Sequence, residues 1–334
     1  MELMLNINIP KPDVQISHGQ RIVSVGSCFT EHIGNALKEL KFDVLQNPNG
    51  ILFDPASVCA SLASYITNDH YTEADLFELN ELWHSWQHHS RFSGIDKDAV
   101  LKGINESRSG AYQFLQQADW LIITLGSSFS YRLQKGTAGQ TASSGDGGVA
   151  NCHRAPANWF RKHLMTIDET VAGLDTIMHQ LFRFNPKLRI IFTISPVRHV
   201  RDGAIENNRS KARLLEAVHH LVDKFDKLYY FPSYELVIDV LRDYRFYAED
   251  LVHPNYLATE FVLDHFIDTF ISNESKEAIK EIRKLNIARK HKASHPQTKA
   301  HLAFMQTNLE RVKALQKQFP YLNLQEEISY FSSV

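Results

Sequence analysis

The chain has 334 residues, of which 43% are hydrophobic and 22% are charged. This composition is close to that of average globular proteins and excludes disorder over most of the length, and at roughly 150 residues per domain the length allows about two domains. The 36 Lys and Arg residues nearly balance the 38 Asp and Glu residues. The resulting net charge of −2 excludes a whole-protein field that attracts nucleic acid or an anionic membrane.

The cysteines and the apolar segments both bear on where the protein works. An odd number of cysteines (Cys28, Cys59 and Cys152) argues against a disulfide framework and favours a reducing compartment. Residues 1–14 lack the apolar core of a signal peptide, and the longest apolar runs, 121–125 and 190–194, are far shorter than the roughly 18 residues of a membrane-spanning helix. We therefore expect a soluble, cytoplasmic protein.

Between residues 21 and 271, short β-branched or apolar runs alternate with stretches of helical periodicity. The predicted strands are 21–25, 42–46, 120–125, 189–194 and 229–233. The predicted helices are 30–40, 55–66, 104–117, 167–184, 208–224 and 256–271. Such alternation is typical of parallel strands joined by helical crossovers. It predicts a three-layer α/β/α fold around a five-stranded, mostly parallel sheet.

Two segments interrupt this alternation. Residues 67–103 are rich in aromatic residues and histidine, which predicts a small β insertion. Residues 135–150 have the glycine and serine content of a mobile loop. Neither segment is a nucleotide-binding loop, because the chain has no Gly-Lys-Ser/Thr sequence and a single glycine, Gly26, where a dinucleotide fingerprint has three.

The C-terminal part differs from the rest of the chain in its polarity and charge. Two long polar amphipathic helices are predicted over 276–289 and 298–318, which divides the chain into an α/β domain over 1–272 and a helical appendage over 273–334. Between Lys276 and Lys317 there are eleven Lys and Arg residues against three Glu. This excess of positive charge has two interpretations: a solvated helical hairpin docked on the main domain, or a surface that binds an anionic partner.

A serine follows the first predicted strand directly. The segment 24–30 (SVGSCFT) ends the strand, makes a tight turn at Gly26 and enters a helix. The N-terminus of that helix directs free N–H groups and a positive dipole toward any negative charge that forms near Ser27 Oγ, which is the geometry of an acyl-transfer nucleophile. The structural alternative is that Ser27 or Thr30 only caps the helix.

An aspartate and a histidine stand three residues apart before the last predicted core helix. In a turn, this spacing lets the Asp250 carboxylate approach one ring nitrogen of His253, which fixes the tautomer and raises the basicity of the other nitrogen. Ligands of doubly wound sheets bind beyond the carboxyl ends of the strands, and Ser27 and the 250–253 turn are both expected on that rim.

The segment 26–30 (GSCFT) resembles the motif that names the GSCFA family, with Thr30 in the place of the usual Ala. Further matching blocks are 47–55 (NPNGILFDP), 89–93 (HSRFS), 124–126 (TLG), 149–153 (VANCH), 195–199 (SPVRH) and 250–254 (DLVHP). The family is related to the SGNH (GDSL-like) hydrolases, which have a flavodoxin-like fold. This resemblance implies that Ser27 is the nucleophile, His253 the general base and Asp250 the residue that orients it.

The resemblance also implies three oxyanion donors: the backbone N–H groups of Ser27 and Gly50, and a side-chain amide from the third block. The third block of the wider superfamily is Gly-x-Asn-Asp, whereas this chain has Gly126-Ser127-Ser128-Phe129 and no asparagine. We expect Asn151 to supply the missing amide; the alternatives are Asn49 or a hydroxyl of Ser127 or Ser128. The substitution matters because one oxyanion donor contributes about 10²–10³ to the rate.

Other chemistry is conceivable for the cysteines and histidines. Cys28 beside Ser27 invites a thiol mechanism, but a cysteine just inside a helix is more often a buried apolar residue, and Cys152 has packing or substrate-loop roles as alternatives. His84 and His88 have the spacing of two zinc ligands, and with His89 and His153 they form the only histidine group to consider. No Glu follows His84, so we expect no metal.

Substrate contacts are expected from the rim and from the insertion. His89 and Arg91, with Trp83 and Trp86 nearby, form a surface suited to a sugar ring, or else belong to a packed apolar insertion. Arg198 follows the fourth strand and either binds a carboxylate or phosphate or braces the 250–253 loop. The predicted substrate-binding residues are His89, Arg91, Gly126, Ser127, His153 and Arg198.

These residues lead to one preferred function and two alternatives. We expect a serine esterase that removes a small acyl group, such as acetyl, from a carbohydrate or another polar metabolite, without a metal, an organic cofactor or a nucleic-acid partner. An O-acyltransferase would use the same covalent intermediate and pass the acyl group to an alcohol. A non-catalytic module that binds acylated glycans is the third hypothesis, which the altered third block motivates.

Overall fold

The structure is a computed structural model that describes residues 4–137, 139, 141 and 148–333. Half of the loop predicted over 135–150, namely residues 138, 140 and 142–147, lies outside the described residues. At the centre is one sheet of five strands in the order β2-β1-β5-β8-β9, with every neighbouring pair parallel. The strands are β1 (Arg21–Gly26), β2 (Asp43–Gln46), β5 (Trp120–Leu125), β8 (Arg189–Ile194) and β9 (Leu228–Phe231). The predicted sheet is confirmed.

Helices cover both faces of this sheet, because alternate residues of the central strands point to opposite sides. Ile22, Ile122 and Ile191 lie in one buried cluster with the helices α1 (Cys28–Glu39) and α7 (Tyr256–Phe270). Val23 and Ile123 lie in a second cluster. That cluster is covered by α2 (Pro55–Thr67), α3 (Lys97–Gln117), α4 (Ile167–Phe184) and α5 (Gly203–Lys224). The three-layer architecture is therefore as predicted.

The insertion before β5 is smaller than expected. It contains the hairpin of β3 (Phe77–Leu79) and β4 (Leu82–His84), flanked by short 3₁₀ turns at η1 (Glu73–Asp75) and η2 (Ser90–Phe92). The helix α3 begins at Lys97 and not at residue 104, since the Asp96 side chain accepts a hydrogen bond from the Ala99 N–H and caps the helix there.

Several elements were not predicted. An antiparallel pair, β6 (Phe129–Leu133) and β7 (Phe160–Leu164), follows the third block, with η3 (Ala157–Trp159) before its second strand. After β8 and β9 the chain forms short turns that shape the rim of the sheet. These are η4 (Val200–Asp202), α6 (Ser233–Glu235), the π-helix η5 (Leu236–Leu241) and η6 (Tyr244–Phe246).

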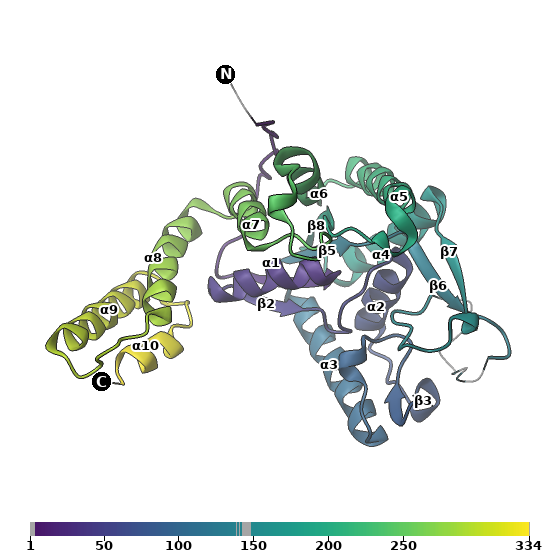
Figure 1. Ribbon diagram of the computed structural model, residues 1–334, viewed down its shortest axis with the longest axis horizontal. Helices are drawn as coiled ribbons and strands as arrows, with labels where there is room; N and C mark the ends of the chain where they lie inside the picture. The colour runs from purple at the N-terminus through teal and green to yellow at the C-terminus, as the bar shows by residue number, and fades with distance from the viewer. Residues whose placement is uncertain (1–3, 138, 140, 142–147, 334) are drawn as a thin grey trace.

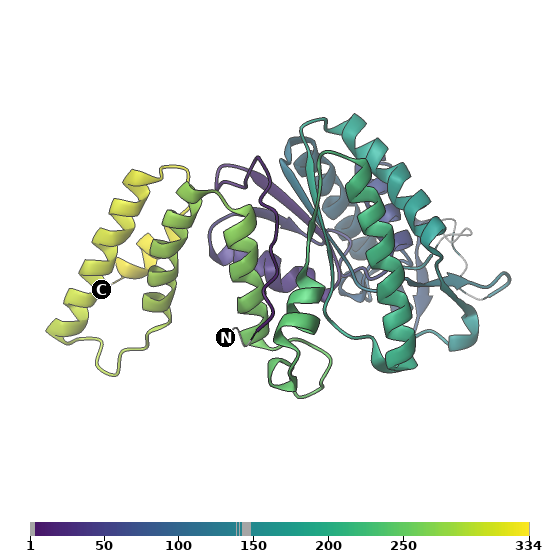
Figure 2. The ribbon, with the colours of Figure 1, turned by 90° about the horizontal axis from the view of Figure 1, so that it is seen from above.

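The C-terminal helices α8 (Asn273–Lys290), α9 (Lys299–Gln318) and α10 (Gln325–Phe331) gather at the end of the molecule opposite β6 and β7 (Figures 1 and 2). Ile282 of α8 and Val312 of α9 are buried in the same cluster as α1 and α7. Part of the predicted positive charge is paired with carboxylates, as in the contacts of Arg283 with Asp264 at 2.7 Å and of Arg289 with Glu327. A boundary at residue 272 stays a prediction.

None of the helices that the structure describes is long and apolar enough to cross a membrane.

Candidate active site

Ser27 lies where β1 ends and α1 begins. It is the N-cap residue of α1, but its side chain makes no capping hydrogen bond, and its hydroxyl oxygen is buried without a partner among the described residues. Gly26 permits this placement: its φ is +143°, and a Cβ atom added there would lie 2.1 Å from Thr124 O. Only glycine fits at this close approach of β1 and β5, so the turn fixes Ser27 at the carboxyl edge of the sheet.

Asp250 and His253 form a hydrogen-bonded pair in a tight turn. His253 Nδ1 lies 2.6 Å from Asp250 Oδ2, and Asp250 Oδ1 accepts the N–H groups of Val252 at 2.9 Å and His253 at 3.0 Å. These hydrogen bonds, first of all that from the His253 N–H, lower the pKa of Asp250 to about 2. The contact predicted from the spacing is therefore present, and it leaves His253 Nε2 as the outer nitrogen.

The turn that carries His253 lies near the start of α1. The pKa of His32, in the second turn of α1, is lowered by burial and then by the charge of His253. The pKa of His199, just after β8, is lowered to about 4 by burial, with further contributions from the charges of Lys211 and His253. His253 thus lies within electrostatic reach of both neighbours of the Ser27 turn. Within the described part of the chain, no hydrogen bond joins Ser27 to His253; such contacts are often long before a substrate binds.

The third block packs directly against Ser27. A Cβ atom added to Gly126 would lie 3.3 Å from Ser27 Cβ and 3.2 Å from Phe53 Cδ1. The N–H groups of Gly126 and Ser127 both donate to Phe53 O, at 2.8 and 3.0 Å. The Ser127 hydroxyl faces Ser210 at 3.1 Å and accepts the Phe129 N–H. Gly126 therefore borders the candidate nucleophile, whereas Ser127 takes part in a buried serine cluster.

The predicted oxyanion donors all have other contacts. The Ser27 N–H donates to Thr124 O at 3.1 Å, and the Gly50 N–H donates to Asn47 O at 2.7 Å. The Asn49 amide donates to Gln87 O at 3.1 Å. Asn151 Oδ1 accepts the His153 N–H at 2.8 Å, which leaves its NH₂ group without a partner in the described ranges. A donor role for Ser27, Gly50 and Asn151 stays a prediction.

Cys28 is a half-buried residue of α1 that packs against the core. Burial raises the pKa of its thiol, although the N–H groups of Phe29 and Cys28 itself act in the opposite direction. Burial likewise raises the pKa of Cys152 to about 11. Since the thiolate is the nucleophilic form, these environments favour packing roles for both cysteines.

The histidines of the insertion lie in an aromatic cluster. His153 is buried, its Nε2 is 2.9 Å from Ser85 O, and its ring contacts those of Trp86 and Phe77. Burial lowers the pKa of His153 to about 4 and that of His88 to about 3. No group of three potential metal ligands occurs among the residues that the structure describes.

His89 and Arg91 connect the insertion to the second block. A Cβ atom added to Gly50, where φ is +83°, would lie 2.2 Å from His89 Cβ, so the two backbones are in close contact. Arg91 donates to Asn47 O and forms an ion pair of 3.9 Å with Glu31 of α1. Both residues therefore lie on the α1 side of the site, and substrate contact by either stays a prediction.

Arg198 braces the loop that carries His253. Its N–H donates to Val252 O at 3.3 Å, and its guanidinium carbon lies 5.5 Å from the centre of the Tyr247 ring. Two neighbours of this loop were missed by sequence reasoning as site residues. His199 belongs to a recognised block but received no role; Lys211 of α5 is buried and donates to Gly126 O and Ser195 O at 2.6 Å each.

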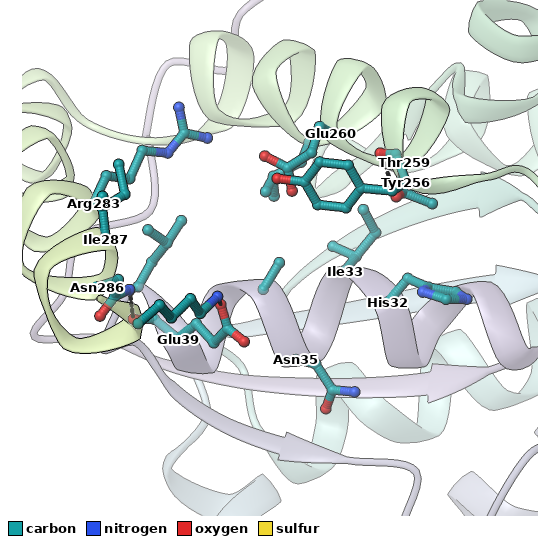
Figure 3. A pocket seen from close by; sticks show the side chains of 14 residues that line it. His32, Ile33, Asn35, Glu39, Tyr256, Thr259, Glu260, Arg283, Asn286 and Ile287 are labelled. Atoms are coloured by element: carbon teal, nitrogen blue, oxygen red, sulfur yellow. Dashed lines mark hydrogen bonds and ion pairs between the residues drawn. The ribbon is translucent and has the colours of Figure 1, made fainter. Parts of the chain in front are cut away.

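A groove of about 440 Å³ lies between α1, α7 and α8. Figure 3 shows Tyr256 and Glu260 of α7 on one side, His32 and Asn35 of α1 on another, and Arg283 of α8 closing the far end. Tyr256 is 72% exposed and lies three residues after His253. This groove could not be predicted from the sequence, because its walls come from three separate helices.

Comparisons with known proteins agree with the blocks found in the sequence. The GSCFA family model matches residues 21–266, and the model of the C-terminal domain of GSCFA domain proteins matches residues 282–333. No curated protein matches the sequence.

Similar solved structures include three esterases. A carbohydrate esterase family 3 protein from Talaromyces cellulolyticus has 8% identity and a TM-score of 0.35, covering 79% of this chain and 99% of that one. A family 3 carbohydrate esterase from Clostridium thermocellum has 8% identity and a TM-score of 0.35, covering 80% and 98%. An acetyl xylan esterase from the rumen bacterium Butyrivibrio proteoclasticus has 12% identity and a TM-score of 0.38, covering 76% and 64%. Similarity at this level carries no argument about function.

Proposed function

This chain belongs to the GSCFA family, and we propose that it is a serine ester hydrolase with Ser27 as nucleophile, His253 as general base and Asp250 as its partner. The Asp250–His253 hydrogen bond of 2.6 Å carries this proposal, because it holds the histidine in the tautomer that accepts a proton at Nε2. Ser27 adds support, since its buried hydroxyl has no other partner among the described residues and stands at a helix N-terminus.

The reaction proceeds through an acyl-enzyme. Ser27 Oγ forms a bond to the ester carbonyl carbon, its proton passes to His253 Nε2, and the carbonyl electrons move to oxygen. The tetrahedral intermediate then breaks the bond to the alcohol oxygen, which takes the proton from His253. Water repeats the sequence on the acyl group and yields the carboxylic acid and free Ser27. Asp250 keeps a proton on Nδ1, so Nε2 is the accepting nitrogen.

The surroundings of the two ends of an ester indicate the substrate class. Ser27 is 1% exposed and borders Gly126, so the acyl group that it takes should be small, such as acetyl. The groove beside His253 offers an exposed tyrosine ring together with amide, carboxylate and guanidinium groups. Aromatic and polar groups together suit the alcohol part of a carbohydrate or another polar metabolite.

The groove also favours a second candidate function. Its volume of about 440 Å³ is enough to hold an acceptor alcohol beside His253 in place of water, which would make the protein an O-acyltransferase. The intermediate is the same, and only the molecule that attacks it differs. Products of hydrolysis that stay unchanged when sugar acceptors are added would argue against transfer.

Labelling with a fluorophosphonate probe tests the nucleophile. We expect the wild type to be labelled and the variant Ser27→Ala to be unlabelled. Ser24→Ala is the matched control, since Ser24 also has a buried hydroxyl without a partner in the described residues but lies earlier in β1. A wild type without Ser27-dependent labelling would leave a binding module for acylated glycans as the remaining hypothesis.

The substrate class has a separate test. We expect Tyr256→Ala to raise KM for an acetylated oligosaccharide at least fivefold while KM for p-nitrophenyl acetate changes less than twofold, because the small ester does not reach the groove. Equal effects on both substrates would show that the groove does not hold the alcohol part.

A further inference from the structure

Several polar atoms near the carboxyl ends of the strands are buried without a hydrogen-bond partner in the described chain. Among them are Ser27 Oγ after β1, Asn47 Nδ2 after β2 and His199 Nε2 after β8. Buried polar groups in folded proteins are nearly always paired, so an unpaired atom calls for a specific explanation. Two such atoms near one another are expected where a polar group of a ligand comes between them.

The contacts of His199 connect its ring to residues that border Ser27. His199 follows β8 and is held by its own N–H, which donates to Asn207 Oδ1 at 2.9 Å. Its ring meets the Phe53 ring edge to face, with 5.4 Å between centroids and 86° between planes. Phe53 in turn contacts Gly126, the residue that borders Ser27. One aromatic ring and one glycine therefore separate His199 from the candidate nucleophile.

Two further residues, Lys211 and His253, lie within electrostatic reach of His199. Lys211 and His253 both lower the pKa of His199, and burial is the larger cause. Lys211 Nζ lies 2.6 Å from Gly126 O, so this amino group also borders the third block, and burial lowers its pKa to about 7. With a pKa of about 4, the imidazole is neutral near pH 7 and has one N–H to donate.

The N–H groups of Ser27 and Gly50, which were predicted to stabilise the oxyanion, donate to other acceptors in this structure. The Ser27 and Gly50 N–H groups donate to Thr124 O and Asn47 O, and the third block has serines in place of asparagine. The Ser127 hydroxyl is engaged with Ser210 and Phe129. Of the predicted side-chain donors, Asn151 keeps an NH₂ group without a partner in the described ranges, whereas the Gly126 block itself supplies no free donor.

We propose that His199 is a catalytic residue whose Nε2–H donates to the oxyanion that forms when Ser27 attacks the ester carbonyl. This role rests on the proposed esterase function and takes the place of the missing third-block amide. A neutral imidazole suits this role, because the hydrogen bond that it donates becomes stronger when negative charge develops on the carbonyl oxygen in the transition state.

Kinetics with p-nitrophenyl acetate test this role. His199→Ala should lower kcat about 10²–10³-fold, the usual loss for one oxyanion donor, with KM changed less than threefold. His199→Gln keeps an N–H donor on a long side chain and should regain at least tenfold of that loss. His220→Ala, an exposed histidine of α5, is the matched control and should keep wild-type kcat.

The other outcomes overturn the inference in distinguishable ways. A kcat of His199→Ala within threefold of the wild type removes the donor role, and so does a His199→Gln variant that folds but gains nothing. A His253→Ala variant that stays active while both His199 variants are dead would make His199 the base. A wild type that no fluorophosphonate labels removes the proposed function itself, and the donor role with it. Melting temperatures of all variants separate loss of catalysis from loss of folding.

Discussion

The two halves of the candidate site are held in opposite ways. Ser27 is 1% exposed and is fixed by the sheet itself, through the close approach of Gly26 to Thr124. The side chains of Asp250 and His253 are 49% and 46% exposed, and their geometry comes from hydrogen bonds within one short turn. The nucleophile is therefore preorganised by the global fold, whereas the base is preorganised locally. Damage to the first half should cost stability, and damage to the second half should cost activity alone.

The largest effect on kcat is expected for the Asp250–His253 turn, the half that is preorganised locally. Asp250→Asn should lower kcat by about 10⁴-fold, because the amide cannot hold the required tautomer of His253 as the carboxylate does. The melting temperature should hardly change, since the turn is exposed. Steady-state kinetics and thermal unfolding measure the two quantities. The pKa of Asp250 is about 2, so the carboxylate stays ionised and its own protonation should not reduce activity above about pH 3.

Asp243→Asn is the matched control for this change. Asp243 is another aspartate of the same rim, and its side chain caps η6 and pairs with Arg245. Its loss should leave kcat within twofold of the wild type. Equal losses in the two variants would show that any change of charge on this rim reduces the rate.

The second effect concerns the half fixed by the sheet. Gly26→Ala should destabilise the protein by about 4 kcal/mol or more, since the new methyl group would overlap a backbone carbonyl in a strained conformation. Denaturant unfolding gives the free energy. Gly110→Ala is the control, because Gly110 lies in α3 with open space around it and should gain up to about 1 kcal/mol. A well-folded Gly26→Ala protein would contradict the tight contact between β1 and β5.

A third prediction concerns pH and the buried histidines beside the site. The folded protein keeps His88 neutral down to about pH 3 and His153 down to about pH 4, whereas the reference value is 6.5. Between these values the unfolded chain binds more protons, so the free energy of unfolding should fall as pH falls from about 6.5 to 4, by up to about 1.4 kcal/mol per pH unit for each histidine.

Substituting one of these histidines isolates its share of the effect. His88→Phe should make the pH dependence below 6.5 shallower, while its stability curve runs parallel to the wild type above pH 7. Chemical denaturation at a series of pH values provides both curves. Parallel curves over the whole range would mean that His88 titrates alike in the folded and unfolded states.

The smallest effect is expected for the brace between the two halves. Arg198→Ala removes the guanidinium from the Tyr247 ring, an interaction worth about 0.5–1 kcal/mol at such sites. A less firmly held 250–253 loop should lower kcat about two- to fivefold without a change in the melting temperature. Arg198→Lys should recover part of the loss. A larger change in KM than in kcat would point instead to direct contact between Arg198 and substrate.

Most of the main sheet could be predicted from the sequence, because its strands are continuous apolar runs that are buried on both faces. The β6–β7 pair was missed since its strands carry charged residues such as Arg132 and Lys162 and lie far apart in the chain. The start of α3 was missed because its first turns are polar, although Asp96 marks the cap.

The same division holds for the candidate site. Asp250 and His253 could be paired from the sequence because three residues in a turn determine their contact. The environments of His199 and Lys211 could not be predicted, since their burial arises where β8, α5 and the second block meet. The engagement of the Ser27 and Gly50 N–H groups also depends on contacts between separate segments.

The strand order has a consequence for how this site can change. The chain leaves β1 for β2 at one edge, then crosses behind it to β5 on the other side, so β1 is the point where the winding reverses. In open α/β sheets the ligand crevice lies at such a reversal, and here Ser27 and Gly126 follow the two strands that border it. The whole segment from Asn47 to the end of α3 lies in that crossing connection, and it delivers His89 and Arg91 beside the crevice. Residues there can be exchanged without touching a strand of the central sheet, so we expect changes of substrate preference among related chains to fall in this insertion.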